Sequence, residues 1–152
     1  MAEQITFDRD VRQAIRTIMA RKAYEEGVVR QVREDLAGFP WLVATHRGLF
    51  AVSADSVVTV AHGWFFGLHR HGNHLFLFEN CGERLRDACR GRIVRFDWQD
   101  GRLSNPQVLV TGLHGNGHQL RMIDGLLCHV DTANQRILRF HPDGRPFDIK
   151  TP

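Results

Sequence analysis

The 152-residue chain has few of the residues that mark several classes of protein: three cysteines, one tyrosine and two lysines. Its apolar runs, such as residues 64–66 and 57–61, are far shorter than the roughly 20 residues of a membrane-spanning helix. The first residues show no basic stretch followed by an apolar one, so we expect no secretory signal. The cysteines lack the spacing of a metal site or a disulfide framework. Together these absences predict a cytoplasmic protein with reduced thiols and no membrane contact.

The positive charge is of one kind, because arginine accounts for almost all of the 20 basic residues. The formal net charge is +3, and the surplus lies in residues 39–152. Arginine binds phosphate well, but these arginines alternate with aspartate and glutamate and form no dense run. The pattern favours a mixed, solvated surface, so nucleic acid is not an expected partner.

Residues 1–38 are predicted to form a helical segment. Apolar residues recur near the helical period from Val11 to Met19 and again from Val28 to Leu36, with Gly27 between the two runs. This indicates an amphipathic broken helix or helical hairpin, spanning about residues 8–37. Its apolar face would cover an edge of the following domain or pair with another chain.

From residue 41 the apolar period changes from 3.6 to 2, so residues 39–152 are predicted to be all-β. Short β-like segments follow one another at intervals of about 8–12 residues. Glycine, asparagine, aspartate and proline separate them, as is typical of an antiparallel meander.

An internal repeat gives this meander its unit. The segment at 63–68 returns 52 positions later at 115–120, and the segment at 92–97 returns 44 positions later at 136–141. The difference is an eight-residue insertion between Cys81 and Cys89 in the first copy. A unit of about 45–50 residues with four short strands has the size of a β-propeller blade. We therefore predict a partial blade at 41–62 and further blades at 64–112 and 116–151.

Residues 124–144 resemble an NHL-type propeller repeat, although His129 stands where that family usually has a small apolar residue. The match is weaker in residues 64–112, where Glu79 and Asn80 replace the typical Asp-Thr pair. The resemblance implies a partial β-propeller, and the motif identifies a fold rather than a chemistry. The matching residues are Asp131, Thr132, Asn134, Arg136, Ile137, Phe140, Asp143 and Gly144.

Polar residues are expected to gather at one end of such a propeller, where its loops converge. Lactonases of the propeller class use a similar set of carboxylates and amides to hold a metal, and the resemblance implies a calcium ion here. His62 or His118 would act as general base. The metal ligands would be Glu79, Asn116, Asp131 and Asn134.

A second arrangement uses nitrogen ligands. His69 and His71 lie on one face if their segment is a strand, and His74 follows closely. Such a group could bind zinc, nickel or copper. The same residues also fit an ordinary hairpin turn with polar flanks.

Two functions follow from this reading. The first is a binding or scaffold module whose blades present a polar end to a partner or small ligand. The second is a metal-dependent hydrolase of the lactonase or esterase type. Because a closed propeller needs about four to eight blades and the repeat supplies about two and a half, we expect a homo-oligomer, another protein partner or a part of a longer propeller.

Overall fold

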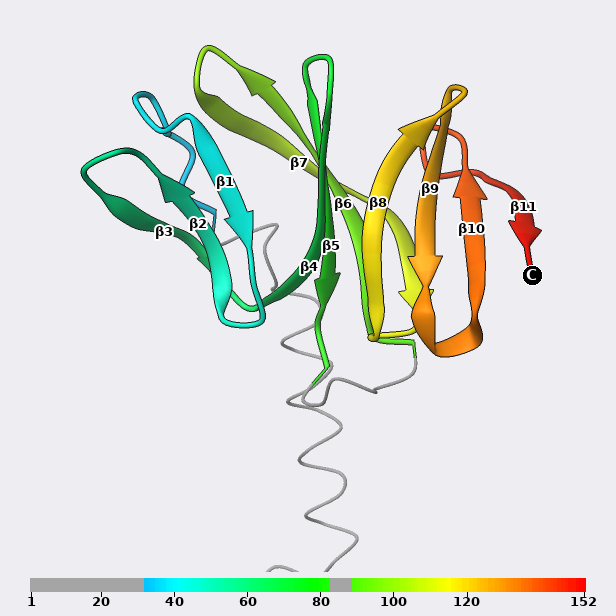
Figure 1. Ribbon diagram of the computed structural model, residues 1–152. Coiled ribbons are helices and arrows are strands. Elements are labelled where there is room, and N and C mark those ends of the chain that lie inside the picture. The colour runs from blue at the N-terminus through cyan, green and yellow to red at the C-terminus, as the bar shows by residue number, and fades with distance from the viewer. Residues whose placement is uncertain (1–31, 83–88) are drawn as a thin grey trace, which may run out of the picture.

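A computed structural model describes residues 32–82 and 89–152 (Figure 1). Within these ranges the chain is all-β and contains no α-helix. The predicted helix lies outside the described residues up to position 31. For residues 32–37 the helix prediction is wrong, because this stretch has no helical turn and Asp35 forms a β-bridge with Arg102. No helix of the described part is long and apolar enough to cross a membrane.

Three antiparallel sheets follow one another along the chain. The first contains three strands: β1 (Trp41–Ala44), β2 (Gly48–Val52) and β3 (Val57–His62). The second contains four strands: β4 (Trp64–His71), β5 (His74–Asn80), β6 (Gly91–Gln99) and β7 (Arg102–Leu113). The third also contains four strands: β8 (Gly117–Ile123), β9 (Leu126–Asp131), β10 (Arg136–Phe140) and β11 (Pro146–Lys150). A short 3-10 turn, Thr132–Asn134, joins β9 to β10.

The second sheet lies between the other two, and the residue pattern of β5 explains this place. Six of its seven residues are buried, because alternate side chains enter two different cores. Leu75 and Leu77 pack toward the first sheet, whereas Phe76 and Phe78 pack toward the third. A strand with both faces apolar is stable only with a layer on each side.

The first strands of the second and third sheets, β4 and β8, lie side by side (Figure 1). Gly67 in β4 makes this approach possible. A Cβ at that position would lie 2.5 Å from the carbonyl oxygen of His118 and 3.2 Å from the backbone nitrogen of Leu120. Only glycine lets the two backbones come this close.

The first sheet differs from the other two in lacking one strand. The last strand of the second sheet, β7, leads into the first strand of the third sheet, β8. In the same way, the last strand of the first sheet, β3, leads into the first strand of the second sheet, β4. When the strands are counted back from these connections, β3 corresponds to β7, β2 to β6 and β1 to β5. Among the described residues, the first sheet therefore has no counterpart of β4, and β1 is an edge strand.

Residues 33–36 connect the first and second sheets as extended chain. The backbone N–H of Arg33 donates to the carbonyl of Val60 in β3 (2.8 Å), and that of Leu103 in β7 donates to the carbonyl of Glu34 (2.8 Å). Leu36 is buried in the core between the two sheets. Its apolar character, which suggested a helix face, serves instead to anchor an extended segment.

Candidate functional site

Glu79, a predicted metal ligand, lies inside the molecule and is already paired with a cation. It stands opposite Arg92 on the neighbouring strand, and the Nε of Arg92 donates to its Oε2 at 2.7 Å. Both side chains are almost fully buried, at 4% and 3% exposed. A buried carboxylate with an arginine partner holds together β5 and β6.

Asp131, another predicted ligand, occupies the corresponding place in the third sheet. It stands opposite Arg136, whose Nε donates to its Oδ2 at 2.8 Å, and Asn134 Nδ2 donates to the same oxygen at 2.9 Å. Burial raises the pKa of the Asp131 carboxyl, but the hydrogen bonds from Asn134 and Arg136 outweigh burial and hold this pKa below its ordinary value. These contacts brace the turn between β9 and β10.

The other predicted site residues lie at the same end of the sheets but form a separate pair. The Oδ1 of Asn116, which immediately precedes β8, lies 3.2 Å from the Nε2 of His118 within β8. His62 is exposed at the end of β3. The structure thus joins Asn116 to His118 and Asn134 to Asp131, and among the described residues no hydrogen bond links one pair to the other.

The expected chemistry of a metal centre has no geometric support in this part of the chain. Across residues 32–82 and 89–152, no group of three or more His, Cys, Asp or Glu side chains is arranged to hold a metal ion. Glu79 and Asp131 each have an arginine as partner. The calcium site, and with it the hydrolase, stays a prediction.

The histidines near the β4–β5 hairpin are also dispersed. The rings of His69 and His71 stack with centroids 6.3 Å apart, while His74 Nδ1 lies 3.2 Å from Asp97. Burial lowers the pKa of His69, and the neighbouring His71 and Arg121 lower it further. His69 is thus favoured in its neutral form, the form that binds metals, but the described residues place no third ligand beside it.

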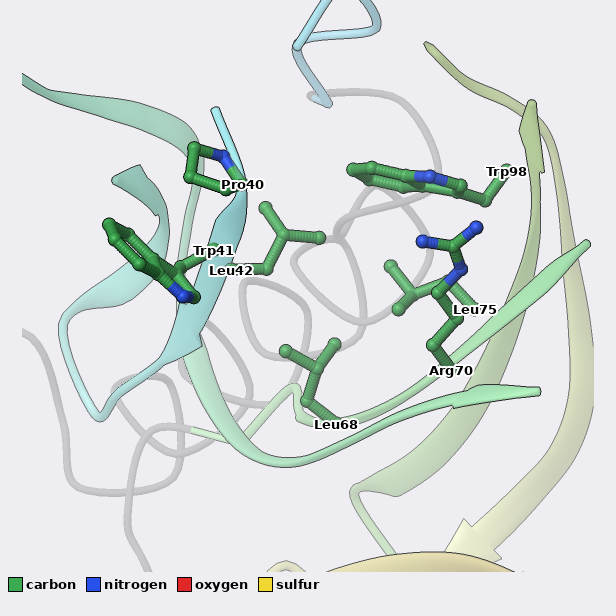
Figure 2. Close-up of a pocket in the computed structure, with 7 residues that line it drawn as sticks. All are labelled: Pro40, Trp41, Leu42, Leu68, Arg70, Leu75 and Trp98. Atoms are coloured by element: carbon green, nitrogen blue, oxygen red, sulfur yellow. The ribbon is translucent and has the colours of Figure 1, made fainter. Parts of the chain in front are cut away.

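A pocket of about 250 Å³ lies between the first and second sheets (Figure 2). It is near the end of the first sheet where β1 begins, whereas His62 lies at the opposite end. Leu42 points into it from β1, and Leu68 and Leu75 form its floor. Trp98 and Arg70 close the far side, and Pro40 and Trp41 lie at the rim. Strand β1, which forms one wall, is the edge strand of the incomplete first sheet.

Arg70 gives this apolar pocket a positive charge. Its guanidinium carbon lies 5.5 Å from the centroid of the Trp98 ring, a cation–π arrangement. Its Nε donates weakly to the Gly72 carbonyl (3.4 Å), and no carboxylate pairs with Arg70 in the described part of the chain. The guanidinium is therefore available to an anion that enters between the two sheets.

The pocket could not be read from the sequence. Trp41, Arg70 and Trp98 lie on three different strands, and no motif links them. The only signal was two tryptophans near strand ends, which is also the pattern of ordinary packing.

Comparison with known proteins gives no family for this chain: no protein-family model matches it, and no curated protein matches it significantly in sequence. The NHL-type resemblance stays a prediction from the residues themselves. Any function must accordingly be argued from the geometry of the sheets and the pocket.

Proposed function

We propose that the chain is a binding module built from propeller-like blades of the NHL kind. The repeat offsets support the proposal, because Glu79–Arg92 and Asp131–Arg136 are cross-strand pairs whose members differ by 52 and 44 positions. The side-by-side placement of β4 and β8 supports it too, since inner strands of neighbouring blades meet near a propeller axis.

The observation that carries the binding role is the guanidinium of Arg70 in the apolar pocket, which has no carboxylate partner in the described part of the chain. Leu42, Leu68 and Leu75 offer an apolar surface, and Trp98 offers an aromatic one beside Arg70. Pockets for small molecules are typically apolar with a few polar groups that fix orientation. The ligand class is a small molecule with a flat apolar body and one negative charge.

Isothermal titration with 2-naphthoate and its uncharged counterpart, 2-naphthamide, tests this proposal. If Arg70 pairs with the carboxylate, naphthoate binds about tenfold more tightly than the amide, which corresponds to about 1.4 kcal/mol. Arg70→Gln removes that preference, because it removes the charge and keeps much of the side-chain length.

Arg47→Gln is the matched control. Arg47 is exposed in the turn between β1 and β2, at the other end of β1 from Trp41. Arg47→Gln should leave the preference for naphthoate over naphthamide unchanged. Equal binding of the two probes, no binding of either, or a preference that survives Arg70→Gln would each disprove the proposal.

A further inference from the structure

The two outermost sheet faces of the described part of the chain carry exposed apolar side chains. On the first sheet, Trp41 is 57% exposed, Val43 44% and Val57 63%. On the third sheet, Ile123 is 49% exposed and Ile137 41%. Contiguous exposed apolar side chains on a sheet mark an interaction surface.

The internal interfaces show how such faces are used in this fold. Each sheet has a front face, which packs on the preceding sheet, and a back face, which packs on the following one. In the second sheet, the front face contributes Leu77 and Val94 to one core, and the back face contributes Phe78 and Ile93 to the other. All four are 0% exposed.

One of the two exposed faces is the front face of the first sheet, and the other is the back face of the third sheet. Val43 and Phe50, a cross-strand pair, point away from the second sheet and form the front of the first sheet. Val130 and Ile137 form the back of the third, where they take the places of Phe78 and Ile93 at the same offsets of 52 and 44. These faces are therefore the two halves of a sheet interface of the kind that the chain forms twice internally.

Charge does not oppose docking of the third sheet. Arg139 on its back face bonds to Asp148, the residue opposite it on β11. Arg95 on the back of the second sheet bonds to its own cross-strand neighbour, Gln107, in the same way. Docking over Arg139 thus buries a charge that already has a partner, whereas an unpaired charge is the one that is costly to bury. Arg121, on the same face in the innermost strand β8, is exposed and must keep its access to solvent in the docked pair.

We infer that the occupant of both faces is a second copy of this chain. The back of the third sheet in one copy packs on the front of the first sheet in the other, and the reciprocal contact closes a ring of two copies. Such head-to-tail contacts close when the rotation between copies fits. Two copies provide six sheets, within the four to eight of closed propellers. The inference rests on sheet packing and is independent of the ligand of Arg70.

Light scattering coupled to size-exclusion chromatography tests the contact. The chain has a mass of 17.4 kDa, and the expected mass in solution is twice that value. Val43→Glu on the front face and Ile137→Glu on the back face should each reduce the mass to that of one copy. Both side chains are partly exposed in a single copy, so circular dichroism should show an unchanged β signal.

Ile149→Glu is the matched control, because Ile149 is 55% exposed but pairs with Leu138, a residue of the internal core, and so belongs to the other side of the third sheet. This variant should stay a dimer. A wild-type mass of one copy, a dimer that survives both face variants, or a mass that grows with concentration without a plateau would overturn the two-copy ring. Naphthoate titration of Val43→Glu, which leaves Arg70 in place, separates this outcome from failure of the proposed function.

Discussion

The two cores between the sheets are built on the same plan but from different residues. The core between the first and second sheets is apolar at its centre, with Leu77 and Phe65 both 0% exposed. In the core between the second and third sheets, the positions 52 residues later hold His129 and Gly117. His129 is also 0% exposed.

The replacement of Leu77 and Phe65 by His129 and Gly117 keeps the core filled but changes its polarity. A Cβ on Gly117 would collide with the imidazole of His129, so the glycine vacates the volume that the ring occupies. The ring stacks on Phe78 at a centroid distance of 4.6 Å. Neither ring nitrogen has a hydrogen-bond partner in the described part of the chain. Equivalent positions in two repeats can thus carry opposite polarity when their neighbours adjust.

The largest difference between the two interfaces should come from their buried ion pairs. Glu79→Gln removes the negative charge from the buried Glu79–Arg92 pair, whose arginine is 3% exposed. Loss of one partner of a buried pair costs about 3–5 kcal/mol. Urea denaturation followed by circular dichroism measures the loss.

Asp131→Asn is the comparison for this variant. Arg136 is 35% exposed and keeps access to water, so we expect a smaller loss of about 1–2 kcal/mol. Equal losses for the two variants would mean that burial of the arginine does not set the cost.

His129 should make the second core sensitive to acid. Burial lowers the pKa of His129 to about 4, from an ordinary value of 6.5. Between pH 4 and 6.5 the unfolded chain binds a proton at His129 that the folded chain does not bind. The free energy of unfolding is therefore at its full value above about pH 6.5 and decreases as the pH falls to 4. The full loss from this group is on the order of 3 kcal/mol.

His129→Leu, which copies Leu77, removes this dependence. At neutral pH the variant should be more stable by about 1–3 kcal/mol, because no buried polar group is left unpaired. Denaturant titrations at pH 7.5, 5.5 and 4.5 test both points. A stability difference between variant and wild type that is the same at all three values would show that His129 does not titrate with folding.

The sequence predicts the strands well but is wrong about a helix at residues 32–37, for a physical reason. Alternating apolar residues specify strands wherever sheets stack, as for Leu75 to Phe78. The apolar spacing of Val32 and Leu36 fits a helix, yet both side chains pack in the core between the first two sheets. Between them, Arg33 and Glu34 form backbone hydrogen bonds with β3 and β7, which are distant in sequence. The sequence leaves two roles open for the charged site residues, as metal ligands or as partners in an ion pair. Glu79 and Asp131 recur because each pairs with an arginine across its strand, a contact that a motif shared with metal sites cannot distinguish.

The most local expected effect concerns the approach of β4 to β8. This approach has no counterpart at the first interface, because β1 is the first described strand there. Gly67→Ala places a methyl group 2.5 Å from the His118 carbonyl, so the two strands must separate. Overpacking of this kind costs about 2 kcal/mol. Hydrogen exchange should then quicken in β4 and β8 while β1 and β2 keep their protection. Gly72→Asn is the control, since Gly72 has φ +58° in an open turn with no atom within 4 Å of a Cβ, and asparagine tolerates this conformation. A uniform loss of protection in all three sheets would mean that the two interfaces unfold as one unit. The interfaces would then differ in their residues but not in their stability.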